Sequence, residues 1–102
     1  MSKICPLYSG STGNSTYIGT KSGNILIDVG ASFKGITEKL SLADAAPEEI
    51  FAVAITHEHS DHIKALPIFL KKHPIPVHLP LACAYKLEGE PSAAPHLLAH
   101  PP

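Results

Sequence analysis

The hydrophobic and polar positions of the chain fall into short blocks that predict strands and helices in alternation. Apolar runs at residues 4–8, 16–19 and 24–29 are separated by turn-forming residues, which predicts three strands in an antiparallel opening. The third run is almost continuously apolar, as in a strand that is covered on both faces. Residues 32–42 then show helical spacing, with Ser32 as the N-cap, and Pro47 opens "PEEI", a favourable start for a short helix.

The second half of the chain continues this pattern and then loses it. Residues 51–55 predict a strand, and residues 61–72 predict a helix that Pro67 kinks or breaks. A last strand over residues 76–79 and a short helix over residues 81–87 follow. Beyond Leu87, four prolines without a clear period predict a flexible tail that lacks a strand. We therefore expect one α/β domain over residues 1–87 and a Pro-rich tail over residues 88–102.

The segment "THEHSDH" at residues 56–62 carries the candidate chemistry, because it follows directly on an apolar strand. Side chains at i and i+2 of an extended segment point to one side, so His57 and His59 can converge on one cation. Asp61 and His62 can reach a second cation close by. Two metals roughly 3.5–4 Å apart can share a water and lower its pKa. Imidazole and carboxylate ligands suit zinc, with manganese or iron also feasible.

Simpler roles exist for several of these residues. Asp61, or Ser60 beside it, could instead cap the following helix. Glu58 alternates away from the neighbouring histidines, which predicts an exposed side chain rather than a catalytic one. The remaining histidines are expected to be ordinary surface or core residues; they are His73, His78, His96 and His100.

Composition limits the class of protein to which the chain can belong. The chain has 102 residues, of which 44% are hydrophobic and 17% charged, and its net charge is -1; these values predict one globular domain. All eight basic residues are lysines spread along the chain, so no basic patch for nucleic acid is visible. Neither a membrane span nor a secretory leader is evident, and we expect a cytoplasmic protein with Cys5 and Cys83 unpaired.

A family resemblance follows from these residues. "THEHSDH" is similar to the HxHxDH signature of the metallo-β-lactamase superfamily, and "LIDVG" precedes it as in that family. The stretch "SGSTGNSTYIGTKSGNILIDVG" resembles the WalJ/YycJ-type branch of metal-dependent exonucleases. The resemblance implies half of an αββα sandwich with a mainly antiparallel or mixed sheet. It also implies two zinc or manganese ions bound by His57, His59, Asp61 and His62, with Asp61 as a catalytic residue and Asp28 orienting a metal-binding histidine.

The same resemblance implies ligands that these residues do not supply. A full family member has three further ligands downstream, among them an aspartate, and no aspartate follows Asp61 here. The chain therefore resembles an N-terminal fragment of a hydrolase, with an unpaired sheet face through which copies could associate. The resemblance favours a phosphodiesterase or DNA exonuclease that uses metal-bound hydroxide. Two alternatives stay open: a hydrolase of thioesters, lactams or cyclic phosphodiesters, and a non-catalytic metal-binding remnant. The loop at residues 9–15 could bind anions near the site or simply connect two strands.

Overall fold

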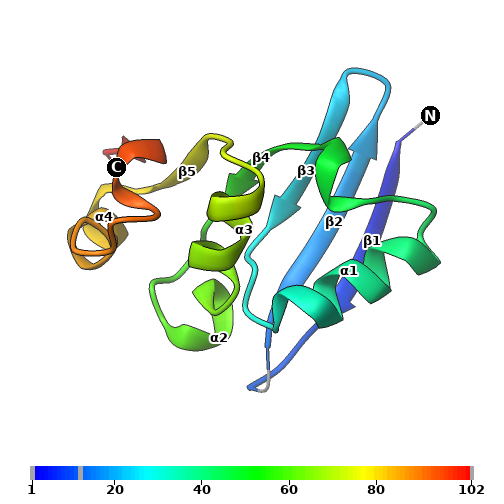
Figure 1. Ribbon diagram of the computed structural model, residues 1–102, viewed down its shortest axis with the longest axis horizontal. Coiled ribbons are helices and arrows are strands. Elements are labelled where there is room, and N and C mark those ends of the chain that lie inside the picture. The colour runs from blue at the N-terminus through cyan, green and yellow to red at the C-terminus, as the bar shows by residue number, and fades with distance from the viewer. Residues whose placement is uncertain (1, 12, 102) are drawn as a thin grey trace.

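The computed structural model describes residues 2–11 and 13–101, and Figure 1 shows a twisted sheet with helices packed against it. The strands of the sheet are β1 (Lys3–Tyr8), β2 (Ser15–Thr20), β3 (Gly23–Ile27), β4 (Ile50–Ala54), β5 (Val77–Pro80) and β6 (Leu97–His100). The α-helices are α1 (Phe33–Leu42), α2 (Ser60–Ile63), α3 (Leu66–Lys72) and α4 (Leu81–Leu87). Short 3-10 turns η1 (Pro47–Glu49) and η2 (Ala94–His96) lead into β4 and β6.

The sheet is mixed, and its strand order follows the order of the chain from β1 to β6. The first three strands form an antiparallel meander, while β3, β4, β5 and β6 run parallel to one another. Parallel neighbours need crossover connections, and helical segments supply them between β3, β4 and β5. The prediction of an α/β fold with a mixed sheet and flanking helices is confirmed.

The helices begin and end for local reasons. Ser32 caps α1 as predicted, since its Oγ accepts a hydrogen bond from the Gly35 N–H at 3.0 Å. The helix predicted over residues 61–72 is two helices, with the break at residues 64–65. Pro67 therefore lies in the first turn of α3, where its missing N–H costs no helical bond. No helix in the described part of the chain is long and apolar enough to cross a membrane.

One prediction about the C-terminal segment was wrong. The sequence suggested no strand beyond Leu87, yet β6 pairs in parallel with β5 over four residues, from Val77↔Leu97 to Pro80↔His100. The apolar run "LLA" is too short to stand out between prolines, and it becomes a strand because the open edge of β5 offers backbone partners.

The core lies between the helices and one face of the sheet. Leu26, Val53 and Val77 from the strands are fully buried there with Ile36 from α1 and Phe69 from α3. The ring of Phe69 meets that of Phe33 edge to face at a centroid distance of 5.6 Å.

The opposite face of the sheet is less covered than the sequence suggested. Ile25 and Ile27 alternate with buried Leu26 and are only half-buried, so β3 is not covered on both faces. Ile4 and Phe51 are exposed on other strands, at 68% and 54%. Self-association through such a face stays a prediction.

Candidate functional site

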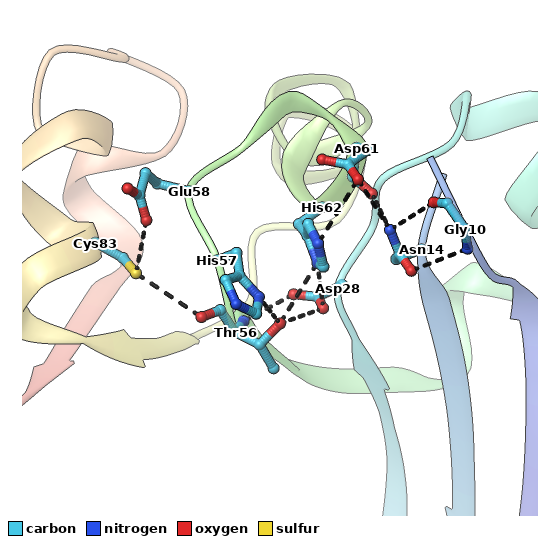
Figure 2. A network of polar contacts seen from close by, with 9 residues as sticks. All are labelled: Gly10, Asn14, Asp28, Thr56, His57, Glu58, Asp61, His62 and Cys83. Carbon is cyan, nitrogen blue, oxygen red and sulfur yellow. Dashed lines mark hydrogen bonds and ion pairs between the residues drawn. The ribbon is translucent and has the colours of Figure 1, made fainter. Parts of the chain in front are cut away.

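The segment "THEHSDH" forms the connection between the end of β4 and helix α2, and Figure 2 shows its polar contacts. Asp28 follows directly on β3, the parallel neighbour of β4, so both strands deliver polar residues to the same edge of the sheet. Asp28 has a left-handed backbone, with φ 62°, and its N–H donates to the Ala54 carbonyl at 2.7 Å. Aspartate tolerates this conformation better than most residues. The conformation places the Asp28 carboxylate against Thr56 of the motif.

Asp28 is 5% exposed, and both oxygens of its carboxylate are engaged by hydrogen bonds. Its Oδ1 accepts from the Thr56 N–H at 2.8 Å. Its Oδ2 accepts from the Thr56 hydroxyl at 2.6 Å and lies 2.8 Å from His62 Nδ1. A buried charge must be satisfied in this way, because an unpaired one costs several kcal/mol.

These contacts assign the histidine tautomers. A carboxylate only accepts, so both the Thr56 hydroxyl and His62 Nδ1 donate to Asp28. With its proton committed, Thr56 Oγ1 accepts from His57 Nδ1 at 3.0 Å. In the neutral form of each ring the proton then lies on Nδ1, which leaves Nε2 with a free lone pair, as a metal ligand requires.

Asp61 is oriented by the loop after β1 rather than by the helix that it starts. Asn14 Nδ2 donates to Asp61 Oδ2 at 3.2 Å and to the Asp61 carbonyl at 3.1 Å, and the Asn14 N–H reaches the same carbonyl at 2.8 Å. Asn14 is itself held by Gly10 (Figure 2). The N-cap of α2 is His59, without a side-chain cap bond, so the capping roles considered for Asp61 and Ser60 do not hold.

Gly30 allows the motif to approach the strand this closely. A Cβ at this position would overlap the Asp61 carbonyl group and press on the His62 backbone nitrogen. The approach brings the Val29 N–H to the His62 carbonyl at 2.8 Å and the Ala65 N–H to the Val29 carbonyl at 2.8 Å. The "DVG" after β3 is therefore tied by its backbone to the start of α2.

The prediction that the Glu58 side chain is exposed was wrong. Glu58 is half-buried, and its Oε2 accepts from the Cys83 thiol of α4 at 3.2 Å, away from His57 (Figure 2). Hydrogen bonding from its own backbone and from Cys83 lowers the pKa of Glu58. Burial, and then the bond to Glu58, raise the pKa of Cys83, which favours the neutral thiol. Cys83 and Cys5 are both unpaired, as predicted.

The predicted ligands lie near one another without forming a closed site. The ring centroids of His57 and His62 are 4.6 Å apart, and those of His57 and His59 are 6.1 Å apart. Asp61 Oδ2 lies 3.8 Å from His62 Nε2. Across residues 2–11 and 13–101, no three His, Cys, Asp or Glu side chains are grouped closely enough to hold a metal. The donor types and the free Nε2 atoms nevertheless fit a divalent metal, while the ligand set is short of a complete centre.

The other histidines lie elsewhere. His73 packs against the rings of Phe33 and Phe69. His78 and His100 contact each other across β5 and β6.

The sequence did not indicate that Asn14, Thr56 or Cys83 contributes contacts at the site. Asn14 lies 47 positions from Asp61, and only its place in the small-residue loop at residues 9–15 gave a signal that this loop could approach the site. Thr56 is part of the quoted motif, but its bridging role depends on the placement of Asp28 beside it.

Comparisons with known proteins identify the family to which the chain belongs. Residues 8–93 match the family model described as the metallo-beta-lactamase superfamily. The chain is 40% identical over 72 residues to the exodeoxyribonuclease YycJ of Bacillus anthracis, covering 71% of this chain and 27% of that protein. It is 44% identical over 71 residues to the exodeoxyribonuclease WalJ of Streptococcus pneumoniae, covering 70% and 26%. The chain thus spans about a quarter of the length of the curated relatives that it matches.

Solved structures show the same fold. A peroxy diiron species of the chemotaxis sensor ODP superposes with a TM-score of 0.79 at 13% identity, over 98% of this chain and 41% of that one. BJP-1, a subclass B3 metallo-beta-lactamase of Bradyrhizobium japonicum, gives 0.69 at 23% identity, over 74% and 30%. With the family model covering most of its length, the chain belongs to the metallo-beta-lactamase superfamily.

Proposed function

We propose that this chain is the metal-binding part of a hydrolase that cleaves DNA phosphodiester bonds from an end. The observation that carries the metal-binding part is the network from Asp28 through Thr56 to His57 and His62, which leaves both Nε2 atoms free. The choice of DNA is supported by relatives at 40% and 44% identity that are named exodeoxyribonucleases.

The residues of the site would have two roles, metal binding and orientation of the metal ligands. One or two divalent cations such as zinc or manganese would be held by His57, His59, Asp61 and His62. When bound, such cations supply an activated water at neutral pH and neutralise charge on a phosphate. Asp28 and Thr56 keep the protons of His57 and His62 on Nδ1, so the ligand nitrogens stay available without rearrangement.

Asn14 would position the carboxylate of Asp61. The Asn14 side-chain amide donates to Asp61 Oδ2 at 3.2 Å, and the close approach of Gly30 holds the Asp61 backbone in place. Asp61 would act at the reacting centre as a ligand and as the group that orients the attacking water.

A nuclease assay tests the proposal. The 102-residue chain is incubated with Mn²⁺ or Zn²⁺ and end-labelled DNA, beside His59→Ala and a matched control, His96→Ala, which alters a histidine outside the motif. We expect metal-dependent, stepwise release of nucleotides by the chain and by His96→Ala, slow because the ligand set is incomplete, and its loss in His59→Ala. Equal release by the chain and by His59→Ala would remove the proposed role of this site.

A second function is favoured by the incomplete ligand set: a metal-binding module without turnover. This alternative predicts that the chain binds Zn²⁺ through the motif, and that no nucleotide release exceeds that of His59→Ala. Metal content after dialysis, read beside the nuclease assay, separates the two functions.

A further inference from the structure

The parallel pairing of β5 and β6 brings together two histidines that the proposed function does not use. His78 pairs with Leu98, and His100 lies two residues further along β6, so both imidazoles stand on the same side of the sheet. His78 Nδ1 and His100 Nε2 are 2.9 Å apart. The rings are inclined by only 25°, with centroids 5.2 Å apart.

These two nitrogens face each other in an open hollow. The hollow has a volume of about 500 Å³, and the side chains around the pair are apolar; they are Leu79, Pro80, Leu81, Ala82 and Pro101. The lining drawn from the described residues includes no carboxylate, no lysine and no residue of "THEHSDH". The histidines therefore form a polar pair of their own, His78 half-buried and His100 exposed to solvent.

We propose that His78 and His100 form a two-imidazole chelate for a divalent transition metal of the copper, nickel or zinc class, separate from the "THEHSDH" cluster. Zinc–imidazole bonds of about 2.0–2.1 Å in tetrahedral geometry place two ligand nitrogens roughly 3.3 Å apart. The observed 2.9 Å needs an opening of a few tenths of an ångström, which small rotations of the two rings supply. Imidazole suits these metals, and the open hollow leaves room for water as the remaining ligands.

The competing explanation is a plain hydrogen bond. One ring would donate N–H to the other, and the pair would serve only to fasten β6 to β5. A proton and a metal ion compete for the same pair of nitrogens, so the two explanations differ in what happens when metal is added.

Copper titration distinguishes them, because Cu²⁺ binds such sites most strongly among these ions. Cu²⁺ alone is titrated into the full chain, His78→Ala, His100→Ala and the control His96→Ala, and bound copper is counted after equilibrium dialysis. We expect either pair variant to lose one copper equivalent, while His96→Ala keeps it. The affinity of this site should fall at least tenfold, since removing even an outer-shell partner costs roughly 10–100-fold.

A second measurement covers the case in which a variant unfolds. In the unaltered chain, paramagnetic Cu²⁺ added beyond the equivalents that the "THEHSDH" cluster takes up should broaden the ring proton signals of His78 and His100. Unbroadened signals from this pair, or unchanged copper stoichiometry in both folded variants, would overturn the proposal. All three variants keep the motif intact, so a failure of the nuclease assay leaves this result unaffected.

Discussion

Replacing Asp28 with Asn tests how the site prepares its ligands. Asparagine has nearly the same shape and tolerates the left-handed backbone at φ 62°, so the fold should survive. The new amide can keep the bond from the Thr56 N–H, but its NH₂ cannot accept from the Thr56 hydroxyl or from His62 Nδ1. His62 should therefore accept at Nδ1 and carry its proton on Nε2, which is the nitrogen that a metal needs.

The expected magnitude follows from the bonds that are lost. A hydrogen bond to a charged group contributes about 1.5–3 kcal/mol, and one of the two bonds at Oδ2 can be recovered by the tautomer change. We expect Asp28→Asn to lose about 2 kcal/mol of unfolding free energy. Its affinity for Zn²⁺ should fall roughly 10–100-fold, the usual cost of removing the partner of a metal-binding histidine.

Calorimetric titration with Zn²⁺ and ¹⁵N NMR of the imidazole rings measure the two effects. Asp44→Asn is the matched control, since Asp44 also has a left-handed backbone, at φ 57°, but is exposed in the turn after α1. Wild-type Zn²⁺ affinity in Asp28→Asn, or a His62 ring still protonated on Nδ1, would refute the reasoning.

Two further predictions concern Gly30, in the segment after β3, and the thiols of Cys5 and Cys83. Gly30→Ala forces a Cβ against the Asp61 backbone, so we expect it to lower the free energy of unfolding by about 3 kcal/mol and to lower the melting temperature. The control is Gly89→Ala, which has open space around the new Cβ and should change the free energy of unfolding by no more than about 0.5 kcal/mol. Equal melting temperatures for the two variants would contradict the close approach at Gly30. Because burial raises the pKa of Cys83 above its ordinary 9.0, iodoacetamide at pH 8 should alkylate half-buried Cys5 first, and Cys83 should react only as the pH rises further. Mass spectrometry of the alkylated chain measures this order. Faster alkylation of Cys83 than of Cys5 would contradict the raised pKa of Cys83.

The sequence predicted the parts of the fold that depend on local pattern. Strands β1 to β5, helix α1 with its Ser32 cap, and helix α4 follow from hydrophobic period and capping chemistry, which act within a few residues. The placement of Asp28 beside the motif also came from the sequence, through its likeness to a known family. In the structure Asp28 Oδ2 lies 2.8 Å from His62 Nδ1, and the role of Asp28 toward a metal ligand stays a prediction.

What the sequence did not predict depends on contacts between distant residues. Strand β6 forms because β5 has an open edge, and four residues between prolines carry too little pattern to reveal it. Asn14 reaches Asp61 across 47 positions, and the thiol of Cys83 meets Glu58 across 25. Such partners are set by packing of the sheet and its helices, which no local propensity encodes.

We propose that "THEHSDH" binds divalent metal through histidines that Asp28 and Thr56 orient. The most direct test is the Zn²⁺ content of the chain after dialysis, measured in a His78→Ala background so that the β5–β6 pair does not contribute. We predict at least one zinc per chain, lost when His57 and His62 are both replaced by alanine. If the chain binds no zinc, or if the double replacement binds as much zinc as the parent chain, the motif is not the metal site.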